Sequence, residues 1–239
     1  MQPQKIVARD EWFKAHKAHL AQEKEFTRQR DQLAAKRLEL PWLKVEQSYT
    51  FDTERGKKTL SELFADKSQL AVYHFMLTPH SEHRCPGCSF LSDHIDAANQ
   101  HLRHHDVSVV VASRAPLAEI LPFKKRMGWQ FDWVSSGESD FNYDFEVSYS
   151  DAQVASGRMV YNFEERSGLK PAQMPRDLPG LSVFYKDESG DVYLTFEVRA
   201  RGGEALIGAY QWLDLMPKGR NETEQNPMKW VRLHDQYER

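Results

Sequence analysis

Apolar residues in the middle of the chain form two kinds of pattern, short continuous runs and helical repeats. The runs Leu70–Leu77 (LAVYHFML) and Val107–Ser113 (VSVVVAS) are predicted to be buried strands, because strands covered on both faces are apolar throughout. Between them, apolar residues recur every three or four positions, which predicts one amphipathic helix. These residues are Leu91, Ile95, Ala98 and Leu102. A strand, a helix and a second strand in this order imply a parallel pair.

Shorter elements are predicted on either side of this unit. Tyr49 and Phe51 alternate with polar residues and Gly56 marks a turn, so a hairpin followed by a short helix is expected. After the second buried strand, apolar residues at helical spacing predict a helix that ends at Gly128. A short third strand is predicted over residues 133–135.

The last third of the domain begins irregularly and ends in a hairpin. Residues 137–179 are predicted to carry loops and short elements. The segments Leu181–Tyr185 and Val192–Val198 are predicted to be strands joined by the turn KDESGD. Gly202 and Gly203 open a last predicted helix. The alternation of strands and helices, closed by a hairpin, predicts the α/β class with a mixed central sheet and helices on both faces.

The chain is predicted to have an extension at each end. Residues 1–45 form an N-terminal helical extension, residues 46–216 the main domain, and residues 217–239 a polar, irregular tail. Asp10 is the expected N-cap of the extension. Its apolar stripe is thin, so we expect it to pack on the main domain or to pair with a second subunit as a homodimer. A solvated charged helix remains the alternative.

Composition narrows the partners and the compartment. The 239 residues are 40% hydrophobic and 28% charged, and a net charge of -3 gives no general reason to expect nucleic acid or a membrane surface as partner. No apolar run approaches the roughly 18 residues that span a bilayer. The N-terminus lacks the apolar core of a secretory signal. A cytoplasmic protein is therefore expected.

The only two cysteines, Cys85 and Cys88, lie in the string RCPGCSF, where the first buried strand has ended and a helix begins. Pro86 suits the first helical turn because its missing N–H would have had no partner there. Free backbone N–H groups and the helix dipole at this end lower the pKa of Cys85, and the thiolate is the attacking species. Cys85 is thus the predicted nucleophile and Cys88 the resolving thiol. The polar loop before the motif predicts that Cys85 is partly accessible.

Two alternatives for the pair remain open, inert buried thiols and a zinc site. Zinc commonly takes two cysteines and two histidines. Seven of the ten histidines lie close to the motif in sequence, although their spacing is not that of a zinc finger. They are His74, His80, His83, His94, His101, His104 and His105. We predict no metal at the site, and no nucleotide or flavin cofactor either, because no Gly-rich loop follows a strand.

Arg114 is a further candidate near the site. It follows the second buried strand, at the sheet edge where the first strand delivers Cys85. Its guanidinium is expected to stabilise a thiolate or to bind an anionic substrate. The alternative is a surface arginine that pairs with a carboxylate.

Several strings in the sequence resemble known families. GKKTLSELF, the strand LAVYHF and the CxxC that follows resemble the peroxiredoxin and thioredoxin-like superfamily. The strings CPGCSF, SRAPL, KKRMGW, WVSS, SDFNYDF, PGLSVFYKD and YQWLDLMPKGR resemble more closely one bacterial family of uncharacterised, predicted dithiol-disulfide oxidoreductases. The resemblance runs from about Gln47 to Arg220. It implies a thioredoxin-like three-layer sandwich with Cys85 and Cys88 as the redox pair.

The resemblance also assigns a role to Pro179. In thioredoxin-like proteins a cis-proline faces the dithiol, just before the strand that opens the C-terminal hairpin. Pro179 in LPGLSVF occupies the matching place, so a cis peptide after Leu178 and a substrate-facing position are implied; an ordinary turn proline is the alternative. The peroxiredoxin pattern of Pro, three residues, Thr, two residues, Cys is not met, because Pro79 lies only six residues before Cys85 and, counted from this proline, His83 stands at the Thr position. This departure argues against peroxidase chemistry.

The function predicted from the sequence is a thiol-disulfide oxidoreductase that acts on a protein or small-molecule thiol or disulfide. The alternative is a non-enzymatic binding module of the same fold, in which the CxxC binds zinc or senses redox state.

Overall fold

The computed structural model describes residues 4–223, 225 and 227–238. The chain divides into two compact units, Met1–Pro41 and Trp42–Arg239. The boundary lies four residues before the one predicted at residue 45. Each unit is described by itself below.

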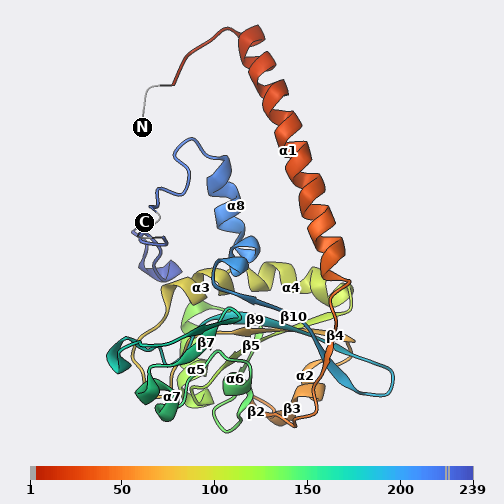
Figure 1. Ribbon diagram of the computed structural model, residues 1–239, viewed down its shortest axis with the longest axis vertical. Helices are drawn as coiled ribbons and strands as arrows, with labels where there is room; N and C mark the ends of the chain where they lie inside the picture. The colour runs from red at the N-terminus through yellow and green to blue at the C-terminus, as the bar shows by residue number, and fades with distance from the viewer. Residues whose placement is uncertain (1–3, 224, 226, 239) are drawn as a thin grey trace. The chain divides into compact units, whose positions relative to one another are not determined.

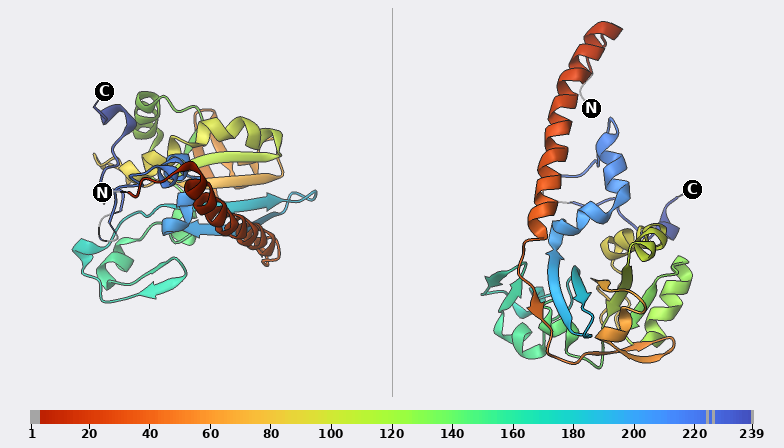
Figure 2. Two further views of the ribbon diagram at one scale, coloured as in Figure 1. Left: turned by 90° about the horizontal axis from the view of Figure 1, so that it is seen from above. Right: turned by 90° about the vertical axis from the view of Figure 1, so that its right-hand side faces the viewer.

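The N-terminal unit is a single helix, α1 (Arg9–Arg37), drawn as one continuous helix in both views of Figure 2. Its N-cap is Ala8, which offers no side-chain hydrogen bond, so the prediction that Asp10 caps the helix is wrong. Asp10 lies in the first turn, where a carboxylate stabilises the positive end of the helix dipole. No residue of α1 is buried. Pairing with a second subunit stays a prediction. Among the described residues, no helix is long and apolar enough to cross a membrane.

The larger unit contains one eight-stranded sheet (Figure 1). From edge to edge its strands are β1 (Leu43–Lys44), β10 (Val192–Arg199), β9 (Gly180–Lys186), β4 (Gln69–His74), β5 (Val107–Ser113), β6 (Asp132–Ser135), β2 (Thr50–Thr53) and β3 (Gly56–Thr59). The central β4, β5 and β6 are parallel, and every other neighbouring pair is antiparallel. The predicted mixed sheet is confirmed.

Helices cover both faces of the sheet. On one face, buried residues of α3 (Pro86–Ser92), α4 (Ile95–His104), α5 (Leu117–Met127) and α8 (Gly208–Leu215) form a single core cluster with Tyr73 and Phe75. On the other face, α2 (Leu60–Leu63) and α6 (Phe141–Asp144) pack with Leu70 and Val72. Successive side chains of a strand point to opposite faces, so β4 contributes buried side chains to the core on both sides of the sheet. The α/β three-layer class is confirmed.

The stretch between β6 and β9 consists of short elements, as predicted. After α6 these are α7 (Asp151–Ser156), β7 (Met159–Tyr161), β8 (Glu164–Arg166) and the 3₁₀ turn η1 (Pro171–Gln173). They enclose a small apolar cluster of their own, made by Tyr149, Val154, Met159, Tyr161 and Met174. The last loop of this stretch leads directly into β9.

Two predicted helices differ in the structure. The helix expected after Cys88 is divided into α3 and α4 at Asp93 and His94. These two side chains bind other elements, since Asp93 accepts from Trp129 Nε1 at 2.8 Å and His94 Nε2 accepts from the Ala209 N–H at 3.1 Å. The last helix begins as a 3₁₀ segment, η2 (Ala200–Leu206), and becomes α-helical only in α8.

The C-terminal segment, predicted to be a polar and irregular tail over residues 217–239, packs on the main unit. It belongs to the same compact unit as the sheet. Val231 and Leu233 are buried in the core cluster to which α3 and α5 also contribute, and Met228 and Trp230 pack against it. The only helical turn of its described residues is the 3₁₀ turn η3 (His234–Gln236). Too few apolar residues occur in the segment to show a pattern, so their burial depends on tertiary contacts.

Because the C-terminal segment packs on the core, we expect truncation of Leu233 to destabilise the protein. Leu233→Ala should lower the free energy of unfolding by about 2–4 kcal/mol, because it leaves a cavity in the core. Leu215→Ala, at a leucine that is 72% exposed, is the matched control and should change it by less than about 0.5 kcal/mol. Urea unfolding followed by tryptophan fluorescence measures both. Equal midpoints for the two variants would show that the segment does not pack on the core.

Candidate active site

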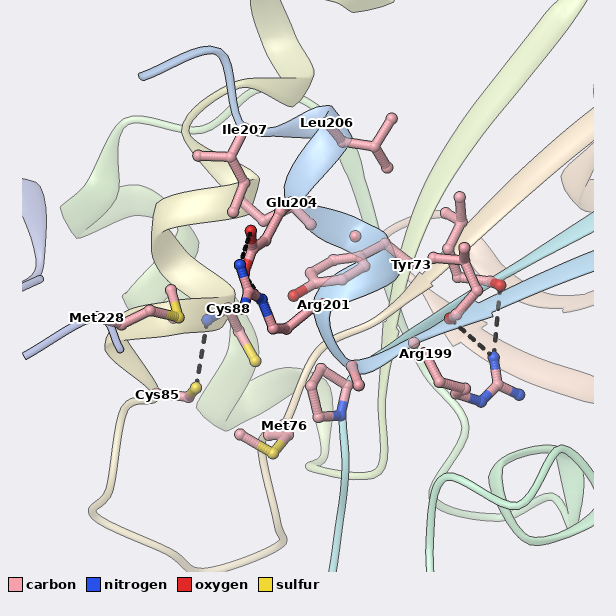
Figure 3. A pocket seen from close by; sticks show the side chains of 18 of the residues that line it. Tyr73, Met76, Cys85, Cys88, Arg199, Arg201, Glu204, Leu206, Ile207 and Met228 are labelled. Carbon is pink, nitrogen blue, oxygen red and sulfur yellow. Dashed lines mark hydrogen bonds and ion pairs between the residues drawn. The ribbon is translucent and has the colours of Figure 1, made fainter. Parts of the chain in front are cut away.

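The backbone places Cys85 immediately before the first residue of a helix. Strand β4 ends at His74, a loop follows, and α3 begins at Pro86 with Cys85 as its N-cap. The Cys85 Sγ accepts a hydrogen bond from the Cys88 N–H at 3.2 Å. Figure 3 shows the two sulfurs on the same side of α3. The predicted location of the pair, after a buried strand and at a helix start, is confirmed.

Both thiols are buried, which corrects the expectation that Cys85 is partly accessible. Cys85 is 7% exposed and Cys88 is 1% exposed. Part of the cover comes from the C-terminal segment, because a Cβ at Gly87 would lie 3.2 Å from Met228 Cε and 3.9 Å from Cys85 Sγ. A side chain at position 87 would require Met228 to move away from α3 by a few tenths of an ångström. The polarity of the preceding loop gives no sign of this distant segment.

The environment shifts the acidities of the two thiols in opposite directions. The pKa of Cys85 is lowered by a hydrogen bond from the Cys88 thiol, and further by the backbone N–H groups of Cys88 and Gly87, against the effect of burial. The pKa of Cys88 is raised well above its usual value, first by burial and then by the neighbouring Cys85. Cys85 is therefore the thiol that ionises first.

Tyr73 is a residue of the site that the sequence analysis did not single out. It lies on β4, is 4% exposed and lines the same cavity as Cys88, and hydrogen bonding by its hydroxyl is among the effects that lower the pKa of the Cys88 thiol against its burial. Burial, followed by the nearby cysteines, raises the pKa of Tyr73 well above its usual value, so the phenol keeps its proton and acts as a donor. The sequence pattern that could have identified Tyr73 is the alternation that starts in β4 and places Tyr73 and Phe75 on one face of the sheet.

A cavity of about 300 Å³ opens beside the two sulfurs. Its walls come from β4, α3, the start of β9, η2 and the C-terminal segment (Figure 3). Apolar side chains make up most of the lining, including Met76, Leu91, Val198, Leu206, Ile207 and Met228. A volume of this size with a mostly apolar lining is typical of sites for small molecules.

Pro179 lies where the resemblance placed it, but its peptide bond does not have the implied geometry. It lines the cavity together with both cysteines. No cis peptide bond occurs within the described residues, so the bond after Leu178 is trans. Leu178 donates its N–H to the Val147 carbonyl at 2.8 Å, and Gly180 already pairs with His74 in the sheet. This extended entry into β9 is compatible with the trans form, which X–Pro bonds prefer.

Arg114 does not line the cavity, which corrects its predicted substrate-facing role. Its Nε and Nη2 donate to the two carboxylate oxygens of Asp177 at 2.7 and 3.0 Å. Asp177 also accepts hydrogen bonds from Ser148 and Thr78. The alternative, pairing with a carboxylate, is confirmed, although the pair is buried. Because Asp177 stands two residues before Pro179, the pair fixes the loop that delivers this proline to the cavity.

Within the described part of the chain, the two sulfurs do not belong to a cluster of metal ligands. Among the described residues, no group of three or more His, Cys, Asp or Glu side chains is arranged to hold a metal ion. His80 lies instead beside Glu119, with 3.1 Å between its Nδ1 and a carboxylate oxygen. A structural zinc site takes four protein ligands. The described side chains around the two cysteines therefore do not provide the set of ligands that the zinc-site alternative requires.

Comparison with known proteins gives a family and distant structural likenesses. The model of a family described as "Bacterial protein of unknown function (DUF899)" matches residues 1–237. No curated protein matches the sequence.

The structural likenesses are to peroxiredoxins. One is a mutant of PrxQ from Xylella fastidiosa, with 13% identity, a TM-score of 0.45 and coverage of 69% of this chain and 88% of that one. Another is peroxidoxin BcpB from Mycobacterium tuberculosis, with 11% identity, a TM-score of 0.43 and coverage of 70% and 94%. Likenesses this distant say nothing about activity.

The opposed acidities predict a difference in reactivity. Alkylation with iodoacetamide near neutral pH should label Cys85 before Cys88, because the thiolate is the reactive form. Its rate should rise with pH through a pKa below that of an ordinary cysteine and level off above it. Peptide mass spectrometry of the partly alkylated protein identifies the labelled residue. Labelling of Cys88 first would reverse the assigned roles.

Loss of the Tyr73 hydroxyl should affect Cys88 selectively. Tyr73→Phe removes the hydrogen bond that lowers the pKa of the Cys88 thiol, so that pKa should rise further. Closure of the Cys85–Cys88 disulfide from a mixed disulfide should then slow by about tenfold near neutral pH, since a charge-assisted hydrogen bond contributes about 1.5–3 kcal/mol. The pH profile of closure should shift upward, while the profile of Cys85 alkylation stays in place. Tyr193→Phe, on the β10 strand, is the control. An equal shift in both profiles would mean that Tyr73 acts only on the packing.

Proposed function

The chain belongs to this DUF899 family of bacterial proteins, and we propose that it is a thiol-disulfide oxidoreductase that uses Cys85 and Cys88 as its redox pair. The observation that supports this most directly is the asymmetry of the two thiols. One has the lower pKa and three hydrogen-bond donors at the start of a helix, and the other is fully buried behind it. Such a pair divides naturally into an attacking and a resolving thiol.

The proposed reaction is an exchange in two steps. The Cys85 thiolate attacks one sulfur of the substrate disulfide, which forms a mixed disulfide and releases the other sulfur as a thiolate. Cys88 then gives up its proton and attacks the Cys85 Sγ, which releases the second substrate thiolate. The protein is left with a Cys85–Cys88 disulfide, and two electrons have passed to the substrate.

Each neighbouring group has a role in this sequence. The N–H of Cys88 stabilises the Cys85 thiolate before attack and again when Cys85 is the leaving group in the reverse reaction. The Tyr73 hydroxyl donates to Cys88, which favours the Cys88 thiolate needed for the second step. Pro179 forms part of the wall against which the substrate sulfur would lie.

The direction of exchange in the cell depends on the reduction potential of the pair. A value near that of thioredoxin, about -270 mV, would mark a reductant, and one near -120 mV an oxidant. Equilibration with glutathione buffers, followed by thiol trapping, measures it.

The division of roles predicts which single substitution traps an intermediate. Cys88→Ser keeps the nucleophile but cannot resolve, so a mixed disulfide with the substrate should accumulate. Cys85→Ser should lose exchange altogether, by at least about 10³-fold, because no activated thiol remains. Expression of both variants in a bacterial host, with separation on a non-reducing gel and mass spectrometry after acid quenching, detects the adduct.

Two outcomes would contradict the proposal. Adducts in Cys85→Ser but not in Cys88→Ser would reverse the two roles. If the wild-type pair also resists oxidation by a small disulfide reagent, it is not a redox pair. The double variant with both serines is the control for adducts formed through neither thiol.

A further inference from the structure

We propose that the substrate is a small disulfide, or the corresponding thiol, that carries an uncharged apolar group, and that this group occupies the cavity beside Cys85. The inference rests on the proposed function, and it names the substrate class of the same site. Three features of the described residues support it: the cover over the sulfurs, the lining of the cavity, and the pairing of the charges around it.

The cover over the sulfurs favours a small substrate. Attack on a disulfide requires the two reacting sulfurs to approach to about 3–3.5 Å. Cys85 is only 7% exposed, with Met228 packed over the start of α3. The sulfur is therefore reached through the cavity, whose volume of about 300 Å³ admits a small molecule. A disulfide held in the surface of a folded protein cannot enter a space of this size.

The lining favours an apolar group. Met76, Leu91, Val198, Ile207 and the other apolar walls offer few hydrogen-bond partners to a ligand. A polar or ionised group moved from water into such a space loses its hydration without compensation. An alkyl group gains from the same transfer, by a factor of about four in affinity for each buried methylene.

The charged residues of the cavity are already paired. Arg201 Nε donates to Glu204 at 2.7 Å, and the second oxygen of Glu204 accepts from Arg220 at 2.8 Å. Arg199 is buried and forms an ion pair with Glu197. None of these groups offers a free charge of one sign to a substrate. The site therefore lacks a counter-charge for the carboxylates of a peptide thiol such as glutathione.

The experiment compares linear disulfides that differ in the attached group. The reduced wild-type protein is mixed with dipropyl disulfide, 2-hydroxyethyl disulfide, glutathione disulfide or insulin at equal disulfide concentration. Formation of the Cys85–Cys88 disulfide is followed in a single turnover by acid quenching, alkylation and mass spectrometry of the protein. The protein loses two alkylatable thiols while two probe thiols are released. Each rate is divided by the rate of dithiothreitol with the same probe, which removes differences in the leaving thiols.

Dipropyl disulfide should give a normalised rate at least about tenfold above those of 2-hydroxyethyl disulfide and glutathione disulfide, because one propyl arm is buried. Dibutyl disulfide should be faster again. Normalised rates that are equal across the small probes, or highest for glutathione disulfide, would overturn the inference. A highest rate for insulin would overturn it in favour of a protein substrate.

A matched pair of leucines tests where the apolar group lies. Leu206 lines the cavity and is 47% exposed, whereas Leu215 is 72% exposed and lies outside it. Leu206→Gln should lower the preference for dipropyl over 2-hydroxyethyl disulfide by about threefold or more, because it replaces apolar wall by an amide. Leu215→Gln should leave the preference unchanged. An equal effect of both substitutions would contradict the placement in this cavity.

A separate measurement distinguishes this inference from the proposed function. Diamide oxidises a dithiol without requiring a binding site for an apolar group. If diamide leaves both thiols free, the redox function itself fails. If diamide closes the disulfide but the small probes show no preference, the redox function stands and only the substrate class is overturned.

Discussion

The hydrogen bond from the Cys88 N–H to the Cys85 Sγ is the interaction on which the site depends. The first N–H groups of any helix need acceptors, which side-chain oxygens usually supply. Here the acceptor is a sulfur, and it becomes a far better acceptor when it ionises. The bond that caps α3 therefore also lowers the pKa of Cys85, and it adds to the larger effect of the hydrogen bond from the Cys88 thiol. Oxidation removes the thiolate, so the redox state of the pair and the stability of the helix start are coupled.

Burial opposes the ionisation of both thiols, and it makes their pKa values differ. A buried sulfur resists ionisation unless donors surround it. Cys85 has three such donors, whereas Cys88 receives compensation only from Tyr73 and the Met76 backbone, which does not offset its burial. The same apolar surroundings that keep Cys88 protonated also line the cavity. The chemistry of the pair and the character of the space beside it therefore have a common physical origin.

Patterns within short stretches of sequence predicted much of this arrangement, and contacts between distant stretches account for the rest. The buried apolar runs predicted β4 and β5, and the CxxC after β4 predicted the start of a helix. These predictions succeed because such elements depend on residues close together in the sequence. The pairing of Arg114 with Asp177 joins residues far apart in the chain, and no local pattern identifies it. The trans bond before Pro179 is compatible with the sheet register and the Val147 contact, whereas the cis expectation came from resemblance alone.

The C-terminal segment shows how a non-local contact can complete a site that local patterns only begin. The CxxC and its helix form from neighbouring residues, and part of the cover over the sulfur comes from elsewhere. Met228 approaches α3 at Gly87, and Val231 and Leu233 hold the segment in the core. Closing this long loop costs conformational entropy, which burial of these apolar residues helps to offset. Residues close to Cys85 in the sequence thus determine the exchange chemistry, whereas residues near the C-terminus help to determine how a substrate reaches Cys85.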